Sequence, residues 1–217
     1  MNPVSVEQYA NSFNHVKDNL LQGNSYLVNL TFPTKLRTDL DLKGIFRLSE
    51  APYKLLKKND FVIFSPESFV RIKDDHIFSY PMKGTIDADL PNAQEKILNN
   101  DKETWEHNTI VDLIRNDLAM VSNQVSVTKF KYLDLITTHR NRLYQMSSEI
   151  CGVLPNDWRE NLGTIIMNLL PAGSVSGAPK KKTIQIIQEA EKIKRKYYTG
   201  VFGIFDGERL DSAVNIR

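Results

Sequence analysis

The stretch that constrains the fold most tightly is residues 79–85, Ser-Tyr-Pro-Met-Lys-Gly-Thr. Pro81 has no N–H to donate and favours extended backbone before it, while Gly84 permits φ values that other residues avoid. An alternating run over residues 76–80 leads into it, so we predict a strand that ends in a tight turn carrying Lys83. On local sequence alone, Lys83 can be either a solvated turn residue or a functional amine.

Helix and strand patterns alternate along the rest of the chain. Apolar residues at three- and four-residue steps predict helices, and alternation or short apolar runs predict strands. The predicted helices are residues 6–22, 91–98, 102–121, 158–170 and 180–192, with a short one inside 40–57. The predicted strands are residues 25–32, 60–65, 68–72, 76–80, 125–132, 144–154, 198–205 and 210–216. This order is typical of a mixed α/β fold, and Asp206-Gly207 between the last two strands predicts a hairpin.

Length and composition indicate one soluble domain over residues 1–217, since 41% of the residues are apolar and 25% are charged. The net charge of +2 is too small to indicate nucleic acid as a partner. The basic residues at 180–182, echoed within 192–196 by Lys192, Lys194, Arg195 and Lys196, are typical of a solvated helix face.

Cysteine usage and hydropathy indicate where such a protein resides. Cys151 is the one cysteine, which excludes an internal disulfide and fits a reducing compartment. No apolar run approaches the roughly 20 residues of a membrane span, and the N-terminus has no signal-peptide pattern. We therefore expect a cytoplasmic protein without a membrane partner.

Residues 171–180, Pro-Ala-Gly-Ser-Val-Ser-Gly-Ala-Pro-Lys, combine small residues, hydroxyls and a second proline directly before a predicted helix. Ser176 can cap that helix and Pro179 suits its first turn. The same features suit an anion site, because free N–H groups and the helix dipole point at the loop. Local sequence leaves both interpretations open.

The predicted helix 102–121 places Glu106 and Asp117 on a side that otherwise faces the core. A carboxylate buried there needs a partner or a metal. We interpret His107 and His139 as polar helix or turn residues rather than as metal ligands.

Five motifs in a fixed order carry a resemblance to a known family. They lie at residues 81–85 (Pro-Met-Lys-Gly-Thr), 105–118 (Trp-Glu-His to Asn-Asp-Leu), 173–180 (Gly-Ser-Val-Ser-Gly-Ala-Pro-Lys), 198–200 (Tyr-Thr-Gly), and 205–207 with 213–217. Together they resemble the chorismate-binding enzymes from about Tyr9 to Arg217. The resemblance implies an α/β sandwich of large, mostly antiparallel sheets flanked by helices.

Within that family the lysine at position 83 is similar to that of aminodeoxychorismate synthase component I, whereas anthranilate synthases usually have alanine there. The resemblance therefore implies synthesis of 4-amino-4-deoxychorismate from chorismate and ammonia. It also implies a separate glutamine amidotransferase subunit that supplies the ammonia. Anthranilate synthase component I and a non-catalytic chorismate-fold module are the alternatives.

The resemblance assigns roles to single residues. Lys83 matches a nucleophile that attacks C2 of chorismate as a neutral amine, and Glu67 matches the general acid that protonates the departing C4 hydroxyl. Glu106 matches a ligand of Mg²⁺, a hard cation that prefers oxygen ligands. The positions that match substrate-binding residues are Gly84, Thr85, Ser174, Tyr198, Gly200 and Arg217, the last a suitable fork for a carboxylate.

Three departures from the family pattern stand out. Leu27 stands where related synthases often have glutamine and isochorismate synthases have a catalytic lysine, which argues against isochorismate or salicylate synthesis. Gln145 replaces a histidine of many relatives. The family pattern also continues past Arg217 with a helix that carries a second magnesium glutamate, so we expect a catalytic domain without its C-terminal part.

Overall fold

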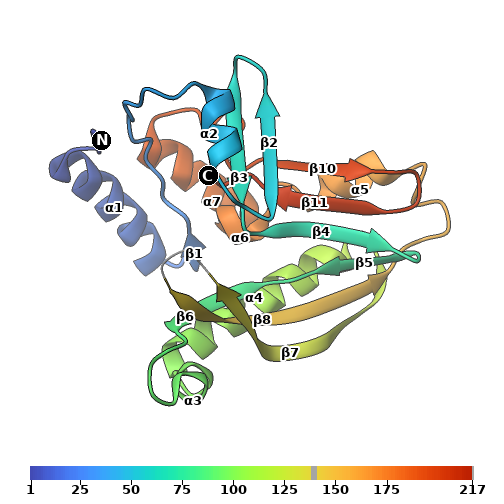
Figure 1. Cartoon of the computed structure of the whole chain (residues 1–217). Coiled ribbons are helices and arrows are strands. Elements are labelled where there is room, and N and C mark those ends of the chain that lie inside the picture. The colour runs from blue at the N-terminus through green and yellow to red at the C-terminus, as the bar shows by residue number, and fades with distance from the viewer. Residues whose placement is uncertain (138–140, 217) are drawn as a thin grey trace. The chain divides into compact units, whose positions relative to one another are not determined.

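The computed structural model describes residues 1–137 and 141–216, and the chain divides into two compact units (Figure 1). The first unit is residues 1–67, 171–202 and 213–217, and the second is residues 68–170 and 203–212. The single domain expected from the length stays a prediction.

The first unit combines helices with two small antiparallel sheets. Its elements are α1 (Val6–Leu21), β1 (Leu27–Val28), α2 (Leu42–Leu48), β2 (Tyr53–Lys57), β3 (Phe61–Ser65), α6 (Gly173–Ser176), β9 (Gly177–Ala178) and α7 (Lys180–Glu191). β1 pairs with β9, and β2 pairs with β3. α1 packs against α7, where Val16, Ile186 and Ala190 form a small core that Val28 and Leu30 extend.

The second unit is built on a large sheet. Its strands are β4 (Ser68–Lys73), β5 (His76–Ser79), β6 (Met82–Asp87), β7 (Asn123–Thr137) and β8 (Arg142–Val153), together with residues 203–205 of β10 (Val201–Phe205) and 210–212 of β11 (Leu210–Val214). The strand order is β10-β11-β4-β5-β8-β6, and β7 pairs with β8. The helices are α3 (Ala93–Leu98), α4 (Asp101–Ala119) and α5 (Leu162–Leu169).

Strand β8 is the centre of this sheet. It pairs antiparallel with β5, β6 and β7, and its Met146 and Ile150 are fully buried. α3 and α4 pack against the same group of strands (Figure 1). The expected mixed α/β fold, with a large antiparallel sheet flanked by helices, is confirmed; the other two sheets have two strands each.

Several predicted boundaries were wrong. The strand expected at 25–32 is only Leu27–Val28, because its partner β9 offers just two residues. The helix expected at 158–170 begins at Leu162, since residues 156–161 form a turn in which the Trp158 Nε1 donates a hydrogen bond of 2.7 Å to Asp75. Lys83 lies inside strand β6 rather than in a turn.

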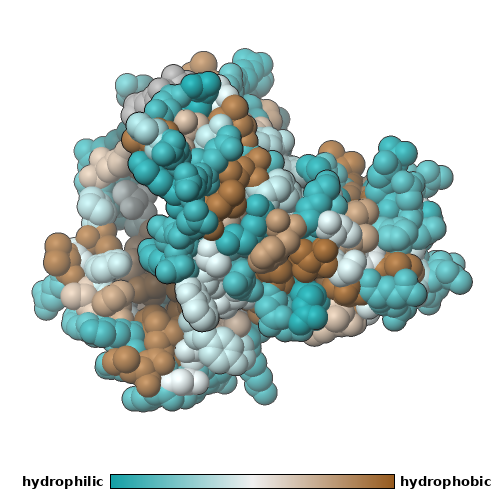
Figure 2. All heavy atoms as spheres, turned by 90° about the horizontal axis from the view of Figure 1, so that it is seen from below, coloured by the Kyte–Doolittle hydropathy of each residue, from teal (hydrophilic) through white to brown (hydrophobic). Residues whose placement is uncertain are grey.

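The molecular surface in Figure 2 is largely hydrophilic with separate apolar patches. Large apolar side chains that are exposed in the second unit include Trp105, Phe130 and Leu135. Scattered apolar side chains are normal on a protein surface and identify no partner by themselves. Among the described residues, no helix has both the length and the apolar character required to cross a membrane.

Candidate functional site

The predicted site residues are divided between the two units. Lys83, Gly84, Thr85 and Glu106 belong to the second unit, and Glu67, Ser174, Tyr198 and Gly200 belong to the first. Arg217 and His139, for which the sequence also made predictions, lie outside the described residues.

Lys83 lies in an irregular part of β6. The pairing of β6 with β8 is regular at Met82 and again from Thr85, and the register shifts between these two residues. Gly84 has a φ of +78° at this bulge, a backbone conformation that side chains rarely adopt. The bulge thus displaces Lys83, which is partly buried, from the regular alternation of the strand.

Helix α4 approaches this bulge. A Cβ atom added to Gly84 would lie 3.1 Å from Oε2 of Glu103, so the glycine leaves room for that side chain. Glu103 and Glu106 are three residues apart and share one face of α4. Thr85 and Glu103 also line a groove with a volume of about 630 Å³ between β6 and the junction of α3 with α4.

Glu106 is not the buried carboxylate that the helical pattern predicted. Its side chain is 48% exposed and forms an ion pair of 3.7 Å with Lys102. Exposure leaves the carboxylate accessible, and the core-facing position is taken by the next residue, His107, which is fully buried.

His107 fixes α4 on the sheet beside Glu106. Its Nε2 lies 2.7 Å from Oγ of Ser148 on β8, and the same hydroxyl accepts a hydrogen bond of 3.0 Å from the backbone N–H of Lys131. Burial, together with the nearby Lys131 ammonium, lowers the pKa of His107 to about 4. The imidazole is therefore neutral at physiological pH, and the prediction that His107 is a polar helix residue fits this position.

The resemblance implies a magnesium ion, which needs oxygen donors in this part of the protein. Within residues 1–137 and 141–216, no three His, Cys, Asp or Glu side chains gather as a metal site. Mg²⁺ is often bound through one or two carboxylates together with oxygens of the substrate. Glu106, with Glu103 one turn before it on α4, offers donors of that kind, so these residues fit a magnesium ion shared with a ligand.

Glu67 lies in the turn between β3 and β4. Oγ of the fully buried Ser65 accepts the Glu67 backbone N–H at 3.1 Å and donates to the Glu67 carbonyl at 3.1 Å. The Val214 N–H donates to the same carbonyl at 3.2 Å. These bonds fix the backbone of the Ser-Pro-Glu turn and leave the Glu67 side chain partly buried.

Ser174 lies in the short helix α6, beside the chain that leaves β1. Nδ2 of Asn29 donates to the Ser174 carbonyl at 3.1 Å, and the Asn29 N–H donates to the Ser176 carbonyl at 3.3 Å. Gly177 has a φ of +117°, and a Cβ there would lie 1.9 Å from the Leu27 carbonyl oxygen. Only glycine allows this close approach.

The capping role predicted for Ser176 was wrong. Its Oγ donates instead at 2.9 Å to the carbonyl of Ala172, the N-cap residue of its own short helix α6. Pro179 occupies the N-cap position of α7, and no side chain caps that helix. The interpretation of this loop as an anion site stays a prediction.

Tyr198 and Gly200 lie in the segment between α7 and β10. The Thr199 N–H donates to the Asn215 carbonyl at 2.7 Å, and the Asn215 N–H donates to the Gly200 carbonyl at 2.8 Å. Asn215 is buried, and its Nδ2 donates to the Tyr197 carbonyl at 2.5 Å. The backbone around Tyr198 is thereby fixed to the end of the chain that the structure describes.

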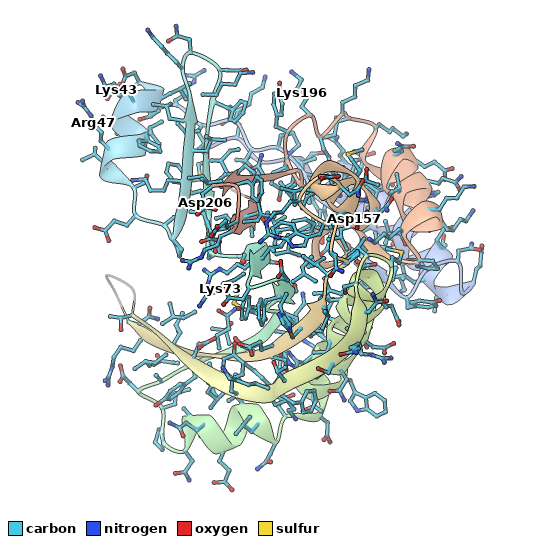
Figure 3. All side chains as sticks on the ribbon, turned by 90° about the vertical axis from the view of Figure 1, so that its right-hand side faces the viewer. Lys43, Arg47, Lys73, Asp157, Lys196 and Asp206 are labelled. Atoms are coloured by element: carbon cyan, nitrogen blue, oxygen red, sulfur yellow. The ribbon has the colours of Figure 1, made fainter. Side chains whose placement is uncertain are left out.

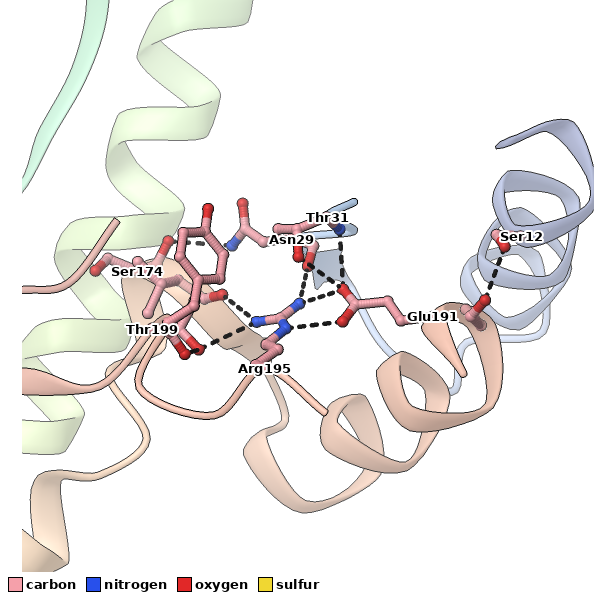
Figure 4. A network of polar contacts seen from close by, with 10 residues as sticks. Ser12, Asn29, Thr31, Ser174, Glu191, Arg195 and Thr199 are labelled. Atoms are coloured by element: carbon pink, nitrogen blue, oxygen red, sulfur yellow. Dashed lines mark hydrogen bonds and ion pairs between the residues drawn. The ribbon is translucent and has the colours of Figure 1, made fainter. Parts of the chain in front are cut away.

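Arg195 and Glu191 connect these first-unit residues, and the sequence predicted a role at the site for neither (Figure 4). The run of basic residues predicts a solvated face for Arg195 as for the neighbouring lysines, and Lys196 does project outward (Figure 3). The Arg195 side chain is instead 14% exposed and pairs with Glu191, which is 1% exposed. Their spacing of four residues, typical of helical ion pairs, was the signal available in the sequence.

The two residues that depart from the family pattern are both partly buried. Leu27 lies opposite Ala178 in the β1–β9 pair. Gln145 on β8 lies opposite Thr85 on one side and Asp134 on the other. Leu27 provides no group for acid or base chemistry, as the sequence indicated.

Comparison with known proteins agrees with these motifs. Residues 2–217 match the family described as chorismate binding enzyme. An uncharacterized PabA-like protein of Haemophilus influenzae is 55% identical over 99% of this chain, and the chain spans 66% of that protein. Anthranilate synthase component 1 of Thermococcus kodakarensis is 28% identical over 99% of this chain, which spans 51% of it.

A solved structure gives the same result for the fold. Anthranilate synthase component I of Streptococcus pneumoniae superimposes with a TM-score of 0.80 at 25% identity, over all of this chain and 50% of that protein. The family predicted from the five motifs is therefore confirmed. On the match over residues 2–217, this chain belongs to the family of chorismate binding enzymes.

Proposed function

We propose that this chain forms the chorismate-binding part of a cytoplasmic aminodeoxychorismate synthase component I, which makes 4-amino-4-deoxychorismate from chorismate and ammonia. The observation that carries the proposal is Lys83, a partly buried amine at a bulge where Gly84 admits the carboxylate-bearing face of α4. Membership of the chorismate binding enzymes supplies the substrate class. The product would serve p-aminobenzoate and folate synthesis.

In the proposed reaction, the Lys83 amine adds to C2 of chorismate, the two conjugated ring double bonds shift, and the bond between C4 and its hydroxyl breaks. Glu67 donates a proton to that hydroxyl, so the leaving group is water. Ammonia then adds at C4, both double bonds shift back, and the bond between C2 and Lys83 breaks. The amine and the carboxyl group return to their starting states once the protons are exchanged with solvent.

The other predicted residues bind the substrate in this proposal. Glu106 would hold Mg²⁺, whose charge neutralises and orients a chorismate carboxylate. Gly84, Thr85, Ser174, Tyr198 and Gly200 would supply backbone and hydroxyl donors, and Arg217 would bind a carboxylate.

We propose a separate glutamine amidotransferase subunit as the source of ammonia. In this proposal the present chain binds chorismate, in keeping with the family match over residues 2–217, and the amidotransferase releases the ammonia. The relative from Haemophilus influenzae is called PabA-like, which supports a place in the same pathway.

The test is intact-protein mass spectrometry after incubation with chorismate and Mg²⁺ but without ammonia. We expect a mass increase of one chorismate less one water, which disappears in Lys83→Ala. Lys73→Ala removes an exposed lysine of strand β4 (Figure 3) and should keep the adduct. An adduct that survives in Lys83→Ala would contradict the assignment of the nucleophile.

Anthranilate synthesis is the second candidate, because the Thermococcus relative and the Streptococcus structure both carry that name. Product analysis with ammonium salts separates the two activities. 4-Amino-4-deoxychorismate supports the proposal, whereas fluorescent anthranilate with release of pyruvate overturns it. Binding of chorismate without any product would identify a non-catalytic module.

A further inference from the structure

Arg195 and Glu191 form a buried ion pair with two hydrogen bonds. Arg195 Nε donates to Glu191 Oε2 at 2.9 Å, and Nη2 donates to Oε1 at 2.6 Å. Thr31 adds its backbone N–H at 2.9 Å and its hydroxyl at 3.2 Å to the same Oε1 (Figure 4). The carboxylate therefore accepts from two segments of the chain, which offsets the cost of burying its charge.

The remaining donors of Arg195 reach three other places in the first unit. Nη2 donates to the Asn29 carbonyl at 2.6 Å, and Nη1 donates to the Val175 carbonyl at 3.3 Å and to the Thr199 hydroxyl at 3.5 Å. Together with the two bonds to Glu191, these contacts use all five N–H donors that a guanidinium has. None is left for a substrate carboxylate, so Arg195 does not act as a ligand.

The three contacts of Arg195 other than Glu191 each lie beside a residue predicted to bind the substrate. Val175 directly follows Ser174, and Thr199 stands between Tyr198 and Gly200. Asn29, whose carbonyl Arg195 contacts, also donates to the Ser174 carbonyl. One side chain thus connects both substrate-binding segments of the first unit.

The segment that Arg195 holds has an unfavourable backbone. Lys192, Lys196 and Thr199 have φ values of 54°, 53° and 64°, which are uncommon for residues other than glycine. Backbone of this kind persists only where its surroundings determine it. The bonds from Arg195 to Thr199 and to Glu191 are such surroundings.

We propose that Arg195, oriented by Glu191, is a positioning residue that sets the backbone of residues 198–200 and 174–175 for chorismate binding. The inference rests on the proposed function, because chorismate is taken as the ligand. Charge alone is insufficient for this role, since lysine keeps the charge but lacks the planar fork. Arg195→Lys is therefore the informative substitution.

The experiment compares Arg195→Lys and Glu191→Gln with Glu189→Gln. Glu189 lies on the same helix, and its side chain is 64% exposed and pairs with His15 at 3.1 Å. Chorismate affinity is measured by titration calorimetry, and backbone mobility by hydrogen–deuterium exchange of peptides that cover residues 172–176 and 193–202. Exchange over the rest of the chain reports whether each variant is folded.

We expect Arg195→Lys and Glu191→Gln to weaken chorismate binding by about tenfold or more, because small displacements of binding groups are costly. Exchange should accelerate in both peptides, while Glu189→Gln should match the parent protein in both measurements. If hydrogen–deuterium exchange in Glu191→Gln is fast throughout the chain, that variant is unfolded. The result for Arg195→Lys then decides the proposal.

Two results would overturn the proposal. Faster exchange of the two peptides with unchanged chorismate affinity would make Arg195 a purely structural residue, and lost affinity with unchanged exchange would make it a direct ligand. Titration of the parent protein comes first and tests the proposed function separately. If the parent protein binds no chorismate, the proposed function is refuted.

Discussion

Gly84 on strand β6 lies against Glu103 on helix α4, close enough that a Cβ at position 84 would be 3.1 Å from the Glu103 Oε2 atom. The contact connects the lysine motif to the helix that carries Glu106. The glycine also has a φ of +78°, so any other residue would be strained here, and its Cβ would require the Glu103 side chain to shift.

We expect Gly84→Ala to lower the free energy of unfolding by about 1–3 kcal/mol, owing to the left-handed backbone and the contact with Glu103. Urea denaturation measures this loss. Gly163→Ala is the control, since Gly163 is helical and a Cβ there meets nothing within 4 Å. That substitution should be neutral or slightly stabilising, and equal losses for the two variants would contradict the account of Gly84.

Gly177→Ala should be more damaging than the backbone strain alone explains. A Cβ at this position would lie 1.9 Å from the Leu27 carbonyl, so the β1–β9 pair must separate. We expect a loss of about 3 kcal/mol or more, the sum of strain and overpacking. Gly207, with a φ of +102° and open space around it, isolates the strain. Thermal unfolding measures the stability of both variants. If Gly207→Ala loses as much stability as Gly177→Ala, the clash with Leu27 does not explain the effect at Gly177.

Asp75 should contribute a pH-dependent part of the stability. Hydrogen bonds from Trp158 and Arg159 lower the pKa of its carboxyl group below the ordinary value of 3.8. A lowered pKa in the folded state stabilises the protein above pH 3.8, and this stabilisation is lost as the pH falls through the folded-state pKa.

Asp75→Asn should therefore reduce the melting temperature at neutral pH and flatten its decline below pH 4. Asp74→Asn is the matched control, because Asp74 is exposed and its ion pair with Lys73 measures 3.7 Å. Melting curves of the two variants are compared between about pH 2.5 and 7, a range that covers the titration of a carboxyl group. Parallel pH profiles would show that Asp75 is not responsible.

Glu106→Gln should raise the Mg²⁺ concentration needed for half-maximal chorismate binding by about tenfold or more, because an amide is a weaker ligand than a carboxylate. Fluorescence titration of chorismate binding at a series of Mg²⁺ concentrations measures the shift. Glu160→Gln, an exposed acidic residue outside the motifs, should leave the titration unchanged. An unchanged curve for Glu106→Gln would remove this residue from the proposed metal site.

The parts of the fold that were predicted correctly are those with regular periodicity. Helix α1 and strand β3 end within one residue of their predicted positions, because helical spacing in the first and a short apolar run in the second mark how far each element extends. Spacing did not determine burial in α1, where Val16 is buried but Tyr9 and Phe13 are exposed. The family was predicted for a different reason: its motifs are short contiguous sequences, and their order is visible without any structure.

The parts that were missed depend on contacts between residues far apart in the sequence. Arg195 was grouped with its exposed neighbours, and only the fold brings Asn29 and Val175 to its guanidinium. Glu103 gave no signal of its own, since its importance comes from the space beside Gly84. The sequence predicted the helix around Glu106 correctly but not which side of that helix faces the sheet. Glu106 was therefore expected to be buried.

The pairing of β6 also determines when the lysine motif acquires its shape during synthesis. In the described sheet β6 lies at one end of the strand order and pairs with β8, where Thr85 is opposite Gln145, 60 residues later. The bulge at Gly84 has no partner strand until β8 has left the ribosome. A nascent chain stalled before residue 143 would carry the whole lysine motif without the conformation that the motif has in the finished protein.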